Sequence, residues 1–303
     1  MIRVARTPCP PSLDPHDPNA GGSRELLRVK EKLARGETVK SDDFSVYGSQ
    51  AVRDALREMF HGKCAYCESK IAGSQDTDVE HYRPKMGVTE ADKAGIHHPG
   101  YWWLAMRWEN LVLSCQHCNQ SRSYHVIIPD DLETEEDLRK FLERKTKTTA
   151  GKLNAFPTEG NLWVTTEAGD LTTERPLILN PVDMDPGEHL DWVLFEGAST
   201  VRARDGSPAG EVTRNILGLN RRWLEEDRRI HLLEMRRLRN RLIDKLNKWL
   251  EAETPEIASI YRTMANEDIE ELVARTEKNQ LFAGMARAFL ELVREEIADM
   301  EGL

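Results

Sequence analysis

Apolar residues recur every three or four positions along much of the chain, a spacing that predicts amphipathic helices. The spacing is almost continuous from Thr213 to Leu303, where Pro255 separates two helices. Earlier in the chain it predicts a helix over Ser23 to Gly36, with the first serine as its N-cap. It predicts a second helix over Ser49 to Phe60, which Gly62 ends.

Two segments in the middle of the chain have different patterns. Pro129 to Ala155 is charged and helical in its spacing. Gly160 to Val201 is richer in β-branched and aromatic residues, which favour strands. We therefore predict short strands there, at Leu162–Val164 and at Leu177–Leu179.

The N-terminal part carries prolines and glycines that indicate a loop. We expect 1–43 to be a poorly packed lead-in, in which Met1 to Val4 could form an edge strand. The chain of 303 residues has room for one large domain or for two to three small ones. We predict an α+β, mostly helical protein with four parts: an N-terminal arm and helices (1–62), a Cys/His-rich module (63–128), a mixed α/β connector (129–212) and a C-terminal helical region that could bind a partner (213–303).

Charge is distributed unevenly. The formal net charge is −10, which is unusual for a nucleic-acid binder, although a single cleft can differ from the whole chain. Arg221 to Leu250 contains ten Lys/Arg against five Asp/Glu, and Glu251 to Leu303 contains five against thirteen. The basic half could contact phosphate, but mutual neutralisation of the two halves in a helical bundle is favoured.

The sequence contains no apolar run long enough to cross a bilayer, and its first residues lack the apolar stretch of a signal peptide. We therefore expect a cytoplasmic protein with no membrane partner.

Four of the five cysteines form two Cys-x-x-Cys pairs, Cys64/Cys67 and Cys115/Cys118, with 47 residues between the pairs. In a reducing compartment such pairs indicate metal ligands before disulfides, and four thiolates favour tetrahedral Zn²⁺. A closed set of four leaves no position for substrate, so we assign this zinc a structural role. A redox pair is the alternative, and Cys9 is interpreted as a free thiol.

Three further segments accompany the cysteines: Asp78-Val79-Glu80-His81-Tyr82-Arg83-Pro84-Lys85, Trp108-Glu109-Asn110-Leu111 and Cys118-Asn119-Gln120-Ser121-Arg122. Their order and spacing resemble the zinc-stapled form of the HNH endonuclease motif. The resemblance implies that 63–128 is a ββα-metal (HNH) nuclease module that hydrolyses phosphodiester bonds of DNA, with RNA not excluded.

Phosphodiester hydrolysis needs an activated water and neutralisation of the charge on phosphate, and one Mg²⁺ or Mn²⁺ can supply the second. Hard cations prefer oxygen ligands, which the Glu80 carboxylate and the Asn119 amide offer. The resemblance implies that His81 is the general base and that Asn110 holds the loop that positions it. Adjacent strand residues point to opposite faces, so a bend is needed for Glu80 and His81 to serve one site.

The resemblance also implies that Arg122 contacts phosphate, and Arg83 and Lys85 are further candidates for this role. The chain departs from the common motif in two ways. Glu80 stands where many HNH proteins have Asp, and Asn119 replaces the final His. Both departures leave the mechanism possible and the identity of the catalytic metal open.

The resemblance extends to segments outside the motif: Met1-Ile2-Arg3-Val4-Ala5-Arg6, Lys63-Cys64-Ala65-Tyr66-Cys67-Glu68, Leu179-Asn180-Pro181 and Asp185-Pro186 with Glu188-His189-Leu190. In these the chain is similar to the HNH effectors of Septu and retron bacterial defence systems (PtuB-like). The resemblance implies an anti-phage role and an ATPase partner of the ABC/SMC type. This chain has no Gly-x-x-x-x-Gly-Lys-Ser/Thr loop of its own. A homo-oligomer is also compatible with the sequence.

Several alternatives remain. The chain could be a zinc-dependent module that binds nucleic acid or protein without cutting it, or a scaffold whose helical tail is its main function. A cluster of acidic residues and one histidine could form a second metal site, although a capped helix start is favoured: Asp183, Asp185, Glu188 and His189. We expect core packing for four aromatic side chains: Tyr101, Trp102, Trp103 and Trp108. We expect loop or structural roles for His97, His98 and His125, and a surface position, not a fifth metal ligand, for His117.

Overall fold

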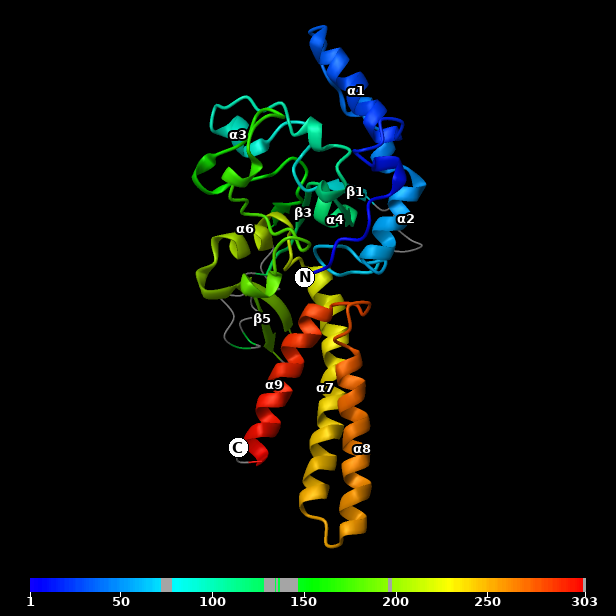
Figure 1. Cartoon of the computed structure of the whole chain (residues 1–303). Helices are drawn as coiled ribbons and strands as arrows, with labels where there is room; N and C mark the ends of the chain where they lie inside the picture. Colours follow the sequence, from blue (N-terminus) through cyan, green and yellow to red (C-terminus); the bar gives the residue numbers. More distant parts are fainter. Residues whose placement is uncertain (72–77, 128–133, 135, 137–146, 196–197, 302–303) are drawn as a thin grey trace.

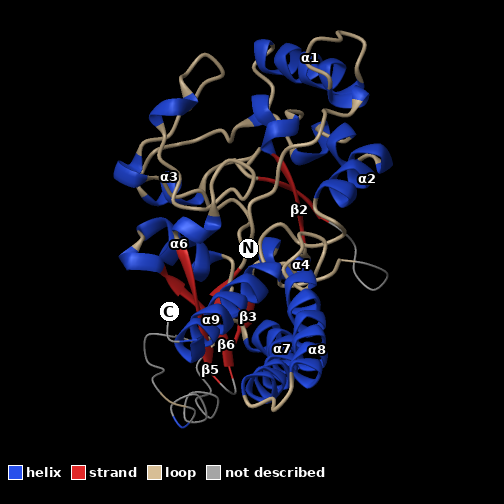
Figure 2. Ribbon diagram, turned by 60° about the horizontal axis from the view of Figure 1, so that its bottom comes forward, coloured by secondary structure: helices blue, strands red, loops and turns tan. Residues whose placement is uncertain are grey.

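The computed structural model describes residues 1–71, 78–127, 134, 136, 147–195 and 198–301. Figure 1 shows an irregular body from which a long hairpin of α7 (Arg222–Leu250) and α8 (Pro255–Ala274) projects, with α9 (Ala283–Glu301) beside it. About half of the chain is helical, and the described strands form small separate sheets, so the protein is α+β. The expectation of a mostly helical chain is too strong, because loops fill much of the body (Figure 2).

The helix predicted over Ser49 to Phe60 is α2 (Gln50–Met59). Its predicted apolar face is buried, at Val52, Leu56 and Met59. Gly62 follows with φ of 67°, a left-handed conformation that glycine adopts without a steric penalty. The turn after α2 therefore forms as its sequence predicts.

The segment before α2 is well packed, so the expectation of a poorly packed lead-in is wrong. Val4 and Leu13 are buried, and the main-chain nitrogen of Val4 donates to the oxygen of Pro181 at 2.8 Å. This single contact gives no strand over Met1 to Val4. The first helix, α1 (Gly21–Ala34), begins before Ser23, so Ser23 is not its N-cap.

The described strands form three separate two-stranded antiparallel sheets. The pairs are β1 (Asp78–His81) with β2 (Leu111–Ser114), β3 (Arg122–Tyr124) with β4 (Thr148–Ala150), and β5 (Leu190–Phe195) with β6 (Ala198–Ala203). In the first pair Glu80 lies opposite Val112 and His81 opposite Leu111. Two short helices, α3 (Thr89–Lys93) and α4 (Gln116–Asn119), follow β1 and β2.

Several predictions in the middle of the chain are wrong. Leu162–Val164 and Leu177–Leu179 lie in loops, and the strands of this region are β5 and β6. Most of the predicted helical stretch from Pro129 to Ala155 lies outside the described residues. Its described end contains β4, a strand, because this end pairs with β3.

The predicted C-terminal helices are present, as α6 (Pro208–Ile216) and α7 to α9. The Asp268 carboxylate of α8 binds two side chains of α7, Lys245 at 2.6 Å and Arg241 at 3.0 Å. Arg275 of α8 lies 3.3 Å from Glu234 of α7. These contacts support the interpretation that the basic and acidic helices neutralise each other.

The core has two parts. The larger cluster joins the N-terminal arm, the cysteines and the C-terminal helices, and the smaller one surrounds Tyr82, Tyr101 and Phe156. Of the four aromatic residues expected in the core, Tyr101, Trp103 and Trp108 are buried and Trp102 is half-buried. Among the described helices, none combines the length and the apolar character that crossing a membrane would require.

Candidate metal centre and active site

Four buried cysteine thiols come together where α2, β2 and α4 meet. Cys64 and Cys67 follow the turn after α2, while Cys115 and Cys118 lie at the start of α4. All four sulfurs lie within 4.8 Å of one another, and the Cys67 and Cys115 sulfurs are 3.7 Å apart. Tetrahedral zinc with Zn–S bonds of about 2.3 Å requires sulfurs about 3.8 Å apart. The cluster therefore has the ligands and the spacing to hold a metal such as zinc.

A buried arginine, not anticipated from sequence, lies against these thiols. The Arg221 guanidinium is 3.6 Å from the Cys118 sulfur and 4.0 Å from the Cys115 sulfur. Burial lowers its pKa, but the opposing effect of Cys118, Cys67 and Cys115 is larger, and the net effect is a raised pKa. A permanent positive charge at this position offsets part of the negative charge of a four-thiolate site.

The strand β1 brings the two central residues of the predicted active site to one cleft. Glu80 and His81 are both largely buried, and both line this cleft although they are neighbours in a strand. The ring of His81 places Nε2 3.0 Å from the main-chain oxygen of Ala105. A carbonyl oxygen can only accept, so Nε2 carries the proton and Nδ1 is left with a free lone pair.

The electrostatics of the cleft keep His81 neutral. Burial, and after it the positive charge of Lys85, lowers the pKa of His81 to about 3. A neutral imidazole with a lone pair on Nδ1 can accept a proton, although a pKa of about 3 makes it a much weaker base than a free imidazole.

Glu80 has a buried cationic partner. The Lys152 ammonium, which is fully buried, lies 2.6 Å from Oε1 of Glu80 and donates to the main-chain oxygen of His81 at 2.9 Å. Burial raises the pKa of Glu80, although the charge of Lys152 opposes this. One carboxylate oxygen of Glu80 is thus engaged by Lys152, and Oε2 remains for another partner.

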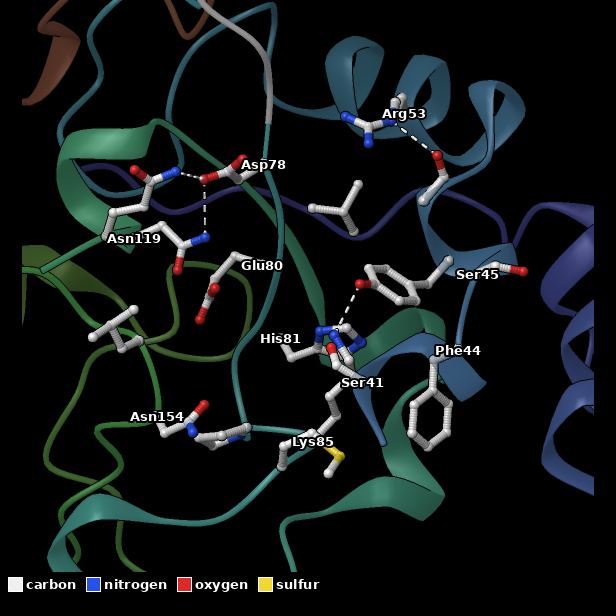
Figure 3. A pocket seen from close by; sticks show the side chains of 17 residues that line it. Ser41, Phe44, Ser45, Arg53, Asp78, Glu80, His81, Lys85, Asn119 and Asn154 are labelled. Atoms are coloured by element: carbon white, nitrogen blue, oxygen red, sulfur yellow. Dashed lines mark hydrogen bonds between the residues drawn. The ribbon is translucent and has the colours of Figure 1, made fainter. Parts of the chain in front are cut away.

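Asn119 is held by a second carboxylate. Its Nδ2 donates to Oδ2 of Asp78 at 3.0 Å. Figure 3 shows the amide nitrogen turned to Asp78 and the amide oxygen turned away, on the side where Glu80 lies. The oxygens of Asn119 and Glu80 are the type of ligand that a hard cation prefers, so these residues fit Mg²⁺ or Mn²⁺.

Asn110 is buried, and it binds main chain instead of lining the cleft. Its Oδ1 accepts from the nitrogen of Arg83 at 2.8 Å, and its Nδ2 donates to the oxygens of Arg83 and Leu104 at 3.0 and 3.3 Å. These bonds fix the chain directly after His81. The geometry agrees with the positioning role that the sequence resemblance implies.

The cleft has a volume of about 750 Å³ and a second wall that sequence reasoning missed. This wall comes from the N-terminal segment and includes Tyr47. Arg53 lies on the same wall (Figure 3). The Lys85 ammonium donates to the Tyr47 hydroxyl at 2.8 Å and lies over its ring. Two basic side chains, Arg53 and Lys85, thus line the cleft together with the acidic Asp78 and Glu80.

The three basic residues predicted to contact phosphate differ in position. Lys85 lines the cleft. Arg83 instead forms an ion pair of 2.8 Å with the fully buried carboxylate of Glu174 and stacks over aromatic rings. Arg122 is exposed and does not itself line the cleft, although it donates to Gln120, which does, and to Gln116. The geometry thus supports Lys85 as a phosphate contact more than the two arginines.

The acidic cluster after Asn180 has a structural explanation. Asp185 caps a short 3₁₀-helix, Pro186–Glu188, by accepting from the nitrogen of Gly187 at 2.9 Å. Within the described part of the chain, the four cysteines form the one group of three or more His, Cys, Asp or Glu side chains placed to share a metal. The favoured interpretation as a helix start is confirmed.

The chain is 33% identical over 228 residues to a Septu protein PtuB of Bacillus mycoides (strain KBAB4), and this match covers 75% of the chain and 66% of that protein. The chain belongs to the PtuB-like family. It is also 30% identical over 112 residues to a Septu protein PtuB of Bacillus thuringiensis, covering 37% of the chain and 36% of that protein.

A Septu protein PtuA of Bacillus mycoides is 26% identical to the chain over 174 residues, which is 57% of the chain and 20% of that PtuA. The PtuB-like chain thus spans slightly less than two thirds of the first relative and much smaller shares of the other two. No family model matches it. No solved structure matches it either.

Proposed function

We propose that this PtuB-like chain is a metal-dependent HNH endonuclease that cleaves DNA as the effector of an anti-phage Septu system. One observation carries the proposal. His81, Glu80 and Asn119 line a single cleft, on a strand–strand–helix unit whose helix begins in the four-cysteine cluster. A binding module has no need for a neutral imidazole beside two oxygen ligands.

The residues of the cleft suit hydrolysis of a phosphodiester. His81 accepts the proton of the attacking water at Nδ1, while its Nε2–H bond to Ala105 keeps the ring in place. Glu80 and Asn119 would hold Mg²⁺ or Mn²⁺, which when bound neutralises charge on the phosphate. Lys85 and Arg53 line the cleft beside this site, where their charges attract the substrate backbone.

The partner is proposed on the family relationship. PtuA shares the Septu name with the PtuB relatives, and we infer that an ATPase of this kind regulates or delivers the nuclease. The long hairpin of α7 and α8 projects from the body and is available for such a contact (Figure 1).

A second candidate function is binding of nucleic acid without cleavage. The ion pair between Lys152 and Glu80 favours it, because an ammonium already occupies one oxygen of the proposed cation ligand.

A cleavage assay separates the two functions. Plasmid DNA, single-stranded DNA and RNA are incubated with the full chain and Mg²⁺ or Mn²⁺, with and without its co-expressed ATPase partner. We expect DNA cleavage by the wild type that EDTA abolishes, loss of cleavage in His81→Ala, and normal cleavage in His97→Ala, since His97 is exposed. Binding of DNA with equal or absent cleavage in all three proteins would favour the second function.

A further inference from the structure

Asp78 faces the same cleft as Glu80 and Asn119, yet the proposed mechanism gives it no role. Asp78 and Glu80 are two positions apart in β1, so their side chains lie on the same face of the strand. Asp78 is only partly exposed, and its Oδ2 accepts from Asn119 Nδ2 at 3.0 Å and from Gln120 Nε2 at 3.5 Å.

The hydrogen bond to Asp78 determines which end of the Asn119 amide faces the cleft. An ionised carboxylate only accepts hydrogen bonds, so the amide must present its NH₂ group to Asp78. Oδ1 then points away from Asp78, on the side where Glu80 lies (Figure 3). A flipped amide would instead present two N–H groups there and would repel a cation.

The other proposed ligand is oriented from the opposite side. Lys152 engages Oε1 of Glu80, which leaves Oε2 as the oxygen without that partner. The segment that carries Lys152 is also bound to α4 through main-chain hydrogen bonds. The main-chain nitrogen of Lys152 donates to the main-chain oxygen of Cys118 at 2.8 Å, and that of Leu153 donates to the main-chain oxygen of Asn119 at 2.7 Å. The two ligand-bearing elements, β1 and α4, are therefore tied to the same segment, and the orientation of the Asn119 amide depends on Asp78.

We propose that Asp78 is a positioning residue, which orients the Asn119 amide so that its oxygen can bind the catalytic cation. This inference rests on the proposed function only for the identity of the cation site. Removal of a group that orients a metal ligand in this way typically lowers metal affinity or activity by about 10- to 100-fold.

The test measures Mn²⁺ binding directly, by electron paramagnetic resonance titration of the zinc-loaded full chain, together with cleavage, zinc content and thermal unfolding. Asp78→Ala should weaken Mn²⁺ binding about tenfold and reduce cleavage at least as much. Asp78→Asn keeps an oxygen that can accept from Asn119, but its NH₂ group also tolerates the flipped amide, so its loss should be smaller than that of Asp78→Ala. Equal losses in both variants would overturn the proposal, because they would show that Asp78 acts by charge or as a ligand.

A second background makes the test independent of folding. In Asn119→Asp the ligand has two equivalent oxygens and needs no orientation, and its charge repels that of Asp78. Removal of Asp78 in this background should leave Mn²⁺ binding unchanged or stronger. An equal weakening in both backgrounds would overturn the proposal.

The two proposals can fail separately. The wild type could bind Mn²⁺ without cutting nucleic acid, while the variants show the expected pattern of Mn²⁺ affinities. This result would support the positioning role of Asp78 and overturn the nuclease proposal. If the wild type cuts DNA and Asp78→Ala binds Mn²⁺ with unchanged affinity, the nuclease proposal holds and the positioning role is overturned.

Discussion

The ring of Tyr47 meets the imidazole of His81 edge-on, with ring centroids 4.4 Å apart and an interplanar angle of 69°. The N-terminal segment thus packs directly against the proposed general base. Tyr47→Ala should reduce cleavage at least about tenfold, because the imidazole loses the ring that confines it. Tyr47→Phe keeps the ring and loses only the bond to Lys85, so its cleavage rate should stay within about threefold of the wild type. Equal rates for Tyr47→Ala and the wild type would contradict this role.

Zinc should depend on the four clustered thiols and not on the fifth. Cys64→Ser should lower the zinc content from one ion per chain toward zero and reduce the melting temperature strongly, since binding of a structural metal contributes to folding. Cys9→Ser is the matched control, because Cys9 lies outside the cluster. Elemental analysis and thermal unfolding of the purified proteins provide the measurement, and a zinc-free wild type of normal stability would refute the prediction.

Loss of the Lys152 ammonium should destabilise the fold. Lys152→Met leaves the Glu80 carboxylate buried without its cationic partner, which costs about 3 kcal/mol for a pair of this kind. The exposed Lys147 provides the control, since Lys147→Met should change the free energy of unfolding by less than about 0.5 kcal/mol. Urea unfolding measures both, and similar midpoints for the two variants would be evidence against the pair.

His98 predicts a loss of stability in acid. Its Nδ1 accepts from the nitrogen of Gly100 at 3.0 Å and its Nε2 lies 2.9 Å from the oxygen of Val164, so the buried ring is neutral. Burial lowers its pKa in the folded chain below the usual value of about 6.5.

Below about pH 6.5, the unfolded chain therefore binds a proton at His98, whereas the folded chain keeps this ring neutral. The contribution of His98 to stability is complete above about pH 6.5 and decreases as the pH falls below that value. Urea unfolding at about pH 5 and about pH 7.5 should show a larger loss for the wild type than for His98→Gln, which cannot titrate. The same pH dependence in both proteins would argue against this assignment.

The hairpin of α7 and α8 should depend on Asp268. This carboxylate is largely buried and binds Lys245 and Arg241, so Asp268→Ala should destabilise the protein by about 2 kcal/mol. Asp244 has an exposed ion pair with Lys248, and Asp244→Ala should have almost no effect. Thermal unfolding compares the two variants, and equal melting temperatures would disprove the difference.

Regular patterns made part of this structure predictable. Helices α2 and α7 follow from apolar residues at helical spacing, because that spacing buries one face of a helix whatever surrounds it. The cysteine cluster was predictable because the sequence has two Cys-x-x-Cys pairs, and such pairs in a reducing compartment are typical metal ligands. The strands expected at Leu162–Val164 and Leu177–Leu179 failed because β-propensity needs a partner strand, and Trp163 instead packs in an aromatic cluster.

Only part of the lining of the proposed active-site cleft could be predicted from the sequence. Glu80, His81 and Asn119 belong to a motif with local spacing, whereas Lys152 reaches Glu80, and Tyr47 reaches the cleft, through tertiary packing. Lys152 is 72 positions from Glu80 and lies in a segment with no distinctive sequence. Its approach depends on Gly151, whose φ is 130° and at which an added Cβ would lie 2.0 Å from the oxygen of Gln120.

Cys118 and Asn119 are consecutive residues of α4, so the thiol cluster and the proposed cation site share one short turn. A chain without the proposed zinc would lack the thiolate clamp on this turn, and Asn119, the proposed ligand for the second metal, would then lose its position. On the proposed function, the nuclease would therefore stay inactive until zinc is bound.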